Sequence, residues 1–298
     1  MLGFLPAPVH GVIIMCLFIV NTVCWAIPVY LMIFFKVLLP KGALRDSVSS
    51  VAAWLAQHWA LTNTILVRIF MRVEWDLRMD MNVTTKGQYL VCANHQTWND
   101  IFVLMHAFGT RAPFFKFFIK QELIWVPILG LAWWGLDYPF MKRYSKEVLA
   151  KHPELKGKDI ETTRKACEAF KNQPALVLNF LEGTRFTQAK HDQQKSPYRH
   201  LLKPKAGGFS FAISALGERI NSMLDVTIVY PDGAKGFWDF CCGRMRKVIV
   251  DVRQLELPHE FFSGDYENDP VFRERFQKWI GDLWAAKDQR IAQMLQGR

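Results

Sequence analysis

The sequence lacks the short motifs of several common kinds of site. Its six cysteines form no CxxC pair and no Cys/His spacing suited to zinc, and no HExxH motif is present. The chain also has no internal repeat and no low-complexity linker. These absences argue against a metal site, a repeat architecture and a disulfide framework. Scattered cysteines of this kind are typical of reduced, buried thiols in a domain on the cytosolic side of a membrane.

Charge is absent from the N-terminal segment. Residues 1–35 contain no Lys, Arg, Asp or Glu, and residues 11–35 are almost wholly apolar, which is long enough to span a bilayer as one helix. A cleaved signal peptide is disfavoured because no basic residue precedes the apolar run and no clear cleavage site closes it. Pro28 interrupts the run, so a bent span and a re-entrant hairpin both stay open.

Basic residues dominate the rest of the chain. The 298 residues are 51% apolar and carry a net charge of +10, so the chain can build a substantial core and still present a basic surface. Such a surface suits nucleic acid, anionic lipid headgroups or phosphorylated substrates. Lys36, Lys41 and Arg45 follow the apolar segment and no Lys or Arg precedes it, which places the main body in the cytoplasm.

Strand and helix patterns alternate after residue 72, which predicts an α/β fold with helices packed on a sheet. Large apolar residues recur every three or four positions from Val51 to Phe70, a stripe that would pack on the body or lie in the membrane interface. The strands are expected at 73–79, 88–94, 114–119, 174–180, 226–230 and 247–252, and the helices at 100–108, 159–170, 207–216 and 271–295. Residues 188–205 are polar and are expected to form a surface loop.

Two polar clusters each follow directly after an apolar strand. His95 ends the second strand and Asp100 follows five residues later. A neutral imidazole oriented by a carboxylate can take a proton from a hydroxyl and return it to a leaving group. The second cluster, 182–185, contains a glycine that allows close backbone approach and an arginine whose planar donors match phosphate. Because sites gather at the carboxyl edge of a sheet, the two clusters can meet there.

Each of these two clusters also has an ordinary explanation without a functional site. A His and an Asp at this spacing also occur by chance, and a Gly-Thr turn flanked by charges is often only a turn. A serine hydrolase or thioesterase would need a serine elbow, and the nearest match, around Ser210, lacks the closing glycine and falls within a predicted helix.

The two clusters together resemble the motifs of the glycerolipid acyltransferases. Residues 94–100 read Asn-His-Gln-Thr-Trp-Asn-Asp and are similar to the NHxxxxD motif of that family, and residues 182–185 are similar to its EGTR motif. Residues 118–143 resemble its second block and residues 226–231 its fourth. All four blocks occur in the family's order, and the nearest members are the 1-acylglycerol-3-phosphate acyltransferases. Leu181 departs from the pattern because many members have proline there.

The resemblance implies a mixed central sheet flanked by helices and a direct acyl transfer without a bound cofactor. His95 would deprotonate the free hydroxyl of a lysophospholipid, and Asp100 would hold the imidazole and stabilise its charged form. The acyl donor would be acyl-coenzyme A or acyl-acyl carrier protein. Lysocardiolipin and lysophosphatidylglycerol are alternative acceptors, and no nucleic-acid partner is expected. The substrate-binding residues implied by the motifs are Lys120, Glu182, Gly183, Thr184 and Arg185, with Arg143 as a further candidate.

These predictions divide the chain into three parts. We expect a transmembrane or re-entrant anchor at 1–40, an amphipathic interfacial region at 41–72, and an acyltransferase domain at 73–298 that ends in an amphipathic helix. The expected location is a bacterial inner membrane with the catalytic domain facing the cytoplasm.

Overall fold

A six-stranded mixed sheet forms the centre of the protein. The computed structural model describes residues 4–141 and 173–297. The strand order is β1-β8-β7-β2-β6-β3, and β1 and β8 run opposite to the other four strands. The strands are β1 Glu74–Asp80, β2 Gln88–Ala93, β3 Phe115–Phe117, β6 Ala175–Phe180, β7 Ser222–Val229 and β8 Lys247–Leu255. The prediction of an α/β fold with a mixed sheet is confirmed.

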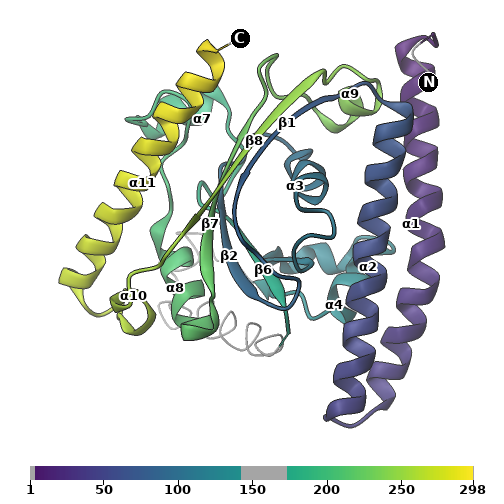
Figure 1. Ribbon diagram of the computed structural model, residues 1–298, viewed down its shortest axis with the longest axis horizontal. Helices are drawn as coiled ribbons and strands as arrows, with labels where there is room; N and C mark the ends of the chain where they lie inside the picture. Colours follow the sequence, from purple (N-terminus) through teal and green to yellow (C-terminus); the bar gives the residue numbers. More distant parts are fainter. Residues whose placement is uncertain (1–3, 142–172, 298) are drawn as a thin grey trace.

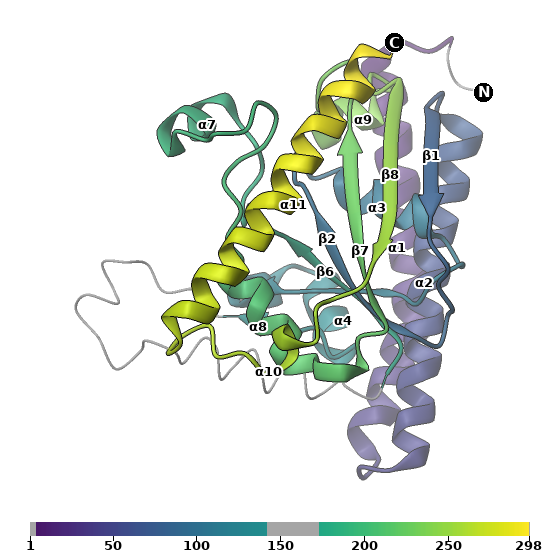
Figure 2. The ribbon, with the colours of Figure 1, turned by 60° about the vertical axis from the view of Figure 1, so that its left-hand side comes forward.

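Helices cover both faces of this sheet (Figure 1). Figure 2 shows α11 running diagonally across one face, on which α8 and α10 also pack. On the other face lie α1, α2, α3 and α9. The helices are α1 Ala7–Leu38, α2 Ala43–Phe70, α3 Asp100–Phe108, α4 Leu129–Gly135, α7 Gln188–Gln194, α8 Ala206–Leu216, α9 Phe237–Cys241, α10 Glu260–Ser263 and α11 Pro270–Gln296, with the 3₁₀ helices η1 Gln121–Trp125 and η3 Gly217–Arg219.

The two helical layers give the protein two apolar cores. Alternate residues of β2 enter them: Val91 and Ala93 pack on the α1–α3 side, whereas Leu90 and Cys92 pack on the α8–α11 side. All four are fully buried, which explains why this strand reads as a continuous apolar run with no alternation. The polar cluster that follows β2 is therefore attached to a strand that is buried on both faces.

Helices α1 and α2 lie side by side as a long antiparallel pair (Figure 1). Small residues of α2, among them Ala52, Ala56 and Ala60, are buried: Ala52 and Ala56 pack in a cluster with Ile119 and Leu136, and Ala60 belongs to the core that α1, α2 and α3 cover. The Asn21 amide of α1 donates to the Asn63 Oδ1 of α2 over 2.8 Å. Large apolar residues of the stripe noted in the sequence point outward instead: Val51, Trp54, Ile65 and Ile69 are each more than two-fifths exposed.

Helix α1 is the one helix in the described part of the chain that is long and apolar enough to cross a membrane. Only 22% of its most apolar 18-residue window is buried. Both of its ends nevertheless contact the α/β domain. The ring nitrogens of His10 lie 2.7 and 3.1 Å from the carbonyl oxygens of Cys241 and Phe70, and Lys36 Nζ lies 2.6 Å from Asp137 Oδ2.

Several expectations for individual segments need correction. The strand expected at 114–119 is two short strands, because β3 pairs with β6 of the main sheet whereas β4, Ile119–Lys120, pairs with β5, Phe140–Met141. Residues 188–205 are not simply a surface loop: they begin with α7, and Leu201 and Leu202 are fully buried. The helix expected at 159–170 and the candidate Arg143 lie outside the described residues.

Candidate active site

Three neighbouring parallel strands bring the site together. β6, β2 and β7 lie side by side in one direction, so their carboxyl ends share one edge of the sheet. His95 follows β2, the 182–185 cluster follows β6, and Tyr230 follows β7. The meeting of the two sequence clusters at one edge is what parallel pairing of β2 with β6 requires.

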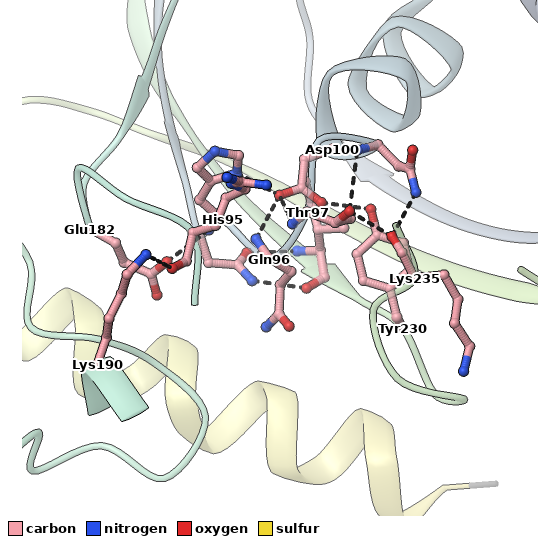
Figure 3. A network of polar contacts seen from close by, with 12 residues as sticks. His95, Gln96, Thr97, Asp100, Glu182, Lys190, Tyr230 and Lys235 are labelled. Carbon is pink, nitrogen blue, oxygen red and sulfur yellow. Dashed lines mark hydrogen bonds and ion pairs between the residues drawn. The ribbon is translucent and has the colours of Figure 1, made fainter. Parts of the chain in front are cut away.

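His95 and Asp100 form a directly hydrogen-bonded pair (Figure 3). The Nδ1 of His95 lies 2.7 Å from Asp100 Oδ2, so Nδ1–H donates to the carboxylate and Nε2 carries the free lone pair. The ring stacks on Phe180 with a centroid distance of 4.0 Å, and its side chain is 16% exposed. Among the described residues none forms a hydrogen bond with Nε2, which leaves that nitrogen available to a substrate hydroxyl.

Asp100 is held by three further donors. Its Oδ2 also accepts the backbone N–H groups of Gln96 and Thr97, over 2.6 and 3.0 Å. Its Oδ1 accepts the phenol O–H of Tyr230 over 2.6 Å. The carboxylate is fully buried, so these bonds replace water as its solvation. Burial raises the pKa of Tyr230 well above its ordinary value, which keeps the phenol protonated as a donor. The sequence alone did not point to Tyr230 as part of the site.

Polar side chains of the same loop fix it to the neighbouring strand and loop. The amide of Asn94 pairs with both backbone groups of Ile228 in β7, over 2.9 and 2.8 Å. Thr97 Oγ1 and Asn99 Nδ2 both donate to the carbonyl oxygen of Lys235, over 2.6 and 2.8 Å. The polar residues between His95 and Asp100 therefore order the loop that presents the pair.

Glu182 faces inward and holds backbone. Its side chain is almost fully buried, its Oε2 accepts the N–H of His95 over 3.0 Å, and its Oε1 accepts the N–H of Leu202 over 3.1 Å. The N–H of Phe186 in turn donates to the carbonyl oxygen of His95 over 2.7 Å. The 182–186 turn thus forms hydrogen bonds with both the N–H and the carbonyl oxygen of His95. Burial raises the pKa of Glu182 to about 8.

The outer side of the same turn is basic. Gly183 has φ +65°, and a Cβ there would lie 3.0 Å from Lys205 Cδ, so only glycine suits the position. Lys190 Nζ donates to Thr184 Oγ1 over 2.7 Å, and the guanidinium of Arg185 lies over the ring of Trp98 with Cζ 4.7 Å from its centroid. Within the described ranges no carboxylate pairs with the cations of Arg185, Lys190 or Lys205. Such a cluster can bind an anion beside His95.

Two other candidates lie apart from this network. Lys120 belongs to the small β4–β5 sheet, is exposed, and pairs with Glu122 over 3.3 Å. The structure does not bring Lys120 into the hydrogen bonds around His95. Ser210 is 1% exposed within α8, so a hydrolytic nucleophile at that position has no access to a substrate.

Comparison with protein-family models identifies the family of this chain. The family model described as Acyltransferase matches residues 76–231, more than half of the chain, and includes both motifs. The chain belongs to this acyltransferase family, as its motifs predicted.

Several proteins named as 1-acyl-sn-glycerol-3-phosphate acyltransferases are similar to this chain. The chain is 28% identical over 184 residues to the mouse protein named 1-acyl-sn-glycerol-3-phosphate acyltransferase gamma, covering 58% of this chain and 44% of the relative. It is 24% identical over 254 residues to the Arabidopsis thaliana 1-acyl-sn-glycerol-3-phosphate acyltransferase 3, covering 80% and 60%. The chain thus matches about half the length of these relatives. The crystal structure of the acyltransferase PlsC from Thermotoga maritima aligns with a TM-score of 0.47 and 16% identity, over 90% of this chain and 98% of that one.

Proposed function

We propose that this protein transfers an acyl chain from an acyl thioester to the free hydroxyl of 1-acylglycerol-3-phosphate, giving phosphatidic acid. The observation that carries the proposal is the His95–Asp100 pair, which is bonded through the backbone of His95 to the 182–186 turn that also carries Arg185. A base beside an anion site is what the deprotonation of a phosphorylated alcohol requires. The names of the relatives support the same class of acceptor.

The proposed mechanism needs one base and no covalent enzyme intermediate. His95 Nε2 takes the proton of the acceptor hydroxyl while Asp100 stabilises the positive charge that forms on the ring. The acceptor oxygen attacks the thioester carbonyl carbon, and the C–S bond breaks as the tetrahedral intermediate collapses. The imidazolium returns its proton to the departing thiolate, so the products are the ester and the free thiol, from coenzyme A or acyl carrier protein.

Arg185 would bind the phosphate of the acceptor. Arg185 is exposed and its guanidinium lies over the ring of Trp98, and its planar donors can form two parallel hydrogen bonds to phosphate oxygens. Lys205, whose side chain lies beside Gly183 of the same turn, would add positive charge there, the part that the sequence had suggested for Lys120. Glu182 and Gly183 shape this pocket, and Thr184 anchors Lys190 at its rim.

The protein would sit on the cytoplasmic face of the membrane with the α1–α2 pair in contact with lipid. Because both ends of α1 are bonded to the α/β domain, a perpendicular span would carry that domain into the bilayer. A flat insertion places the outward apolar residues of both helices in the lipid instead. Trp125 and Trp134 are 86% and 47% exposed on the η1–α4 segment beside α1 and would extend the same surface.

A panel of acceptors tests the function. Purified protein in vesicles receives lysophosphatidic acid, lysophosphatidylglycerol, lysocardiolipin or no acceptor, each with acyl-coenzyme A and acyl-acyl carrier protein. The proposal expects fastest ester formation with lysophosphatidic acid, and a preference for another lysophospholipid would move the acceptor assignment. The variant His95→Ala should lose ester formation and stay folded and membrane-bound, whereas His259→Ala, an exposed histidine near α10, should retain it. Thiol release without ester, unaffected by His95→Ala, would refute the mechanism.

A further inference from the structure

The C-terminal helix α11 contacts the segment that holds Glu182. Two side chains of α11, one turn apart, bond to the backbone of residues 199–202. The indole N–H of Trp284 donates to the carbonyl oxygen of Leu202 over 2.9 Å. The carboxylate of Asp288 accepts the N–H groups of Arg199 and His200, over 2.9 and 2.7 Å. These bonds join parts of the chain more than 80 residues apart.

The backbone of Leu202 is the junction. Its carbonyl oxygen accepts from Trp284, and its N–H donates to Oε1 of Glu182. The other oxygen of that carboxylate accepts the N–H of His95. A continuous series of hydrogen bonds therefore runs from Trp284 through Leu202 and Glu182 to the catalytic histidine. Trp284, Leu202 and Glu182 are each no more than 1% exposed, so no water competes for these bonds.

Helix α11 is itself locked to the sheet. The ammonium group of Lys287, on the same helix, is fully buried and lies 2.6 Å from Oδ1 of Asp225 in β7. Arg290 reaches Oδ2 of the same carboxylate over 2.5 Å. Since β7 neighbours β2 and leads into Tyr230, this ion cluster fixes the helix relative to both members of the catalytic pair. These ion pairs hold α11 in a fixed position relative to β7.

We propose that Trp284 and Asp288 are positioning residues, which set the place of the His95 backbone through residues 199–202 and Glu182. Neither residue touches the substrate in this view. They act by keeping Glu182 fully engaged, so that Nε2 of His95 stays in line with the acceptor hydroxyl. A displacement of a catalytic group by about 1 Å can cost up to about a hundredfold in rate, which makes such support worth retaining.

The test compares matched substitutions on one helix. Trp284→Phe removes the indole N–H and keeps an aromatic ring, and Trp279→Phe is its control, because no described residue accepts a hydrogen bond from that indole. Asp288→Asn removes one of two acceptor oxygens, and Asp282→Asn is its control, because Asp282 is exposed and pairs only with Lys278 within the described residues. The kinetic readout rests on the proposed acyl transfer, and amide hydrogen exchange does not.

We expect Trp284→Phe and Asp288→Asn to lower kcat about tenfold while the KM values for donor and acceptor stay near those of the wild type. Amide exchange should rise at His95 and Leu202 in these variants and not in the controls. Equal kcat and equal exchange in each variant and its control would overturn the inference. If Trp284→Phe fails to fold, the Asp288 pair decides. Absence of wild-type turnover with every acceptor refutes the proposed function alone, and exchange then decides the positioning role.

Discussion

Removal of the Tyr230 hydroxyl isolates the support given to Asp100 from the chemistry of His95. Tyr230 is 6% exposed, and its O–H donates to Oδ1 of Asp100 over 2.6 Å. The substitution Tyr230→Phe deletes this donor and changes the volume little. It leaves the three donors to Oδ2, from His95, Gln96 and Thr97, in place.

The expected cost follows from the charge of the acceptor. A hydrogen bond to a charged group contributes about 1.5–3 kcal/mol, and the remaining Oδ1 is buried where water cannot replace the phenol. The free energy of unfolding should therefore fall by about 2 kcal/mol. In the proposed mechanism Asp100 stabilises the imidazolium, which is present in the transition state and not in the ground state. If the lost hydrogen bond raises the activation free energy by about 1.4 kcal/mol, kcat falls about tenfold.

Tyr138→Phe is the matched control. Tyr138 is also 6% exposed, and its O–H donates to the carbonyl oxygen of Phe115 over 2.5 Å, in the β3–α4 region. Urea unfolding should show a loss of stability in both variants, whereas acyl-transfer kinetics should show a loss of kcat only in Tyr230→Phe. Full kcat in Tyr230→Phe, or an equal loss in Tyr138→Phe, would refute the assignment of Tyr230 to the Asp100 network.

Three further substitutions test the surroundings of the pair. Arg185→Gln should raise the KM for the phosphorylated acceptor and leave the KM for the acyl donor unchanged, as steady-state kinetics with each substrate varied would show. Burial raises the pKa of Glu182 from 4.5 to about 8, so between these pH values the folded protein binds a proton that the unfolded chain does not. The stability of the wild type should therefore fall as pH rises from about 4.5 through about 8. Urea unfolding of Glu182→Gln across the same range should lack this decline. Lys287→Met removes a buried positive charge that pairs with Asp225 and should lower the free energy of unfolding by about 3 kcal/mol in the same assay. The double variant Lys287→Met with Asp225→Asn, which also removes the negative charge, should recover part of that loss.

The strands and the edge that carries the site were predictable because their signals are local. β2 and β6 are short, mainly apolar runs that are followed by polar residues, and His95 and Glu182 stand just after their ends. Once β2 and β6 are parallel neighbours, the meeting of the two clusters follows from geometry alone. The helix at 100–108 was placed correctly for a similar reason, since its apolar spacing begins at Asp100 and ends at a glycine.

The supports of the site were not predictable, because each joins residues far apart in the chain. Tyr230 bonds to Asp100 across 130 positions, and Trp284 bonds to Leu202 across 82. A tyrosine after a strand and a tryptophan in an apolar helix face are ordinary core residues in a sequence. Only the fold shows that the phenol of Tyr230 reaches the Asp100 carboxylate and that the indole of Trp284 reaches the Leu202 carbonyl oxygen.

The orientation of α2 was ambiguous for a physical reason. Apolar residues that face lipid and apolar residues that face a core have the same composition, so a stripe from Val51 to Ile69 could not tell the two apart. The small residues settle the matter in the structure. Ala52, Ala56 and Ala60 recur every four positions on the buried face of α2, and the bulky residues are left on the outer side.

The 182–185 motif gains a physical reason for being contiguous. The carboxyl group of Glu182 points inward, and each of its oxygens accepts a backbone N–H, so it presents no charge to an incoming anion. Gly183 then reverses the chain with a positive φ, and Arg185, three residues after that acid, is exposed on the outer side. Had the acid faced outward, it would repel the phosphate that Arg185 is proposed to bind. One turn thus holds His95 with its buried end and, in the proposed function, binds the substrate phosphate with its exposed end, and separating Glu182 from Arg185 in the chain would separate those tasks in space.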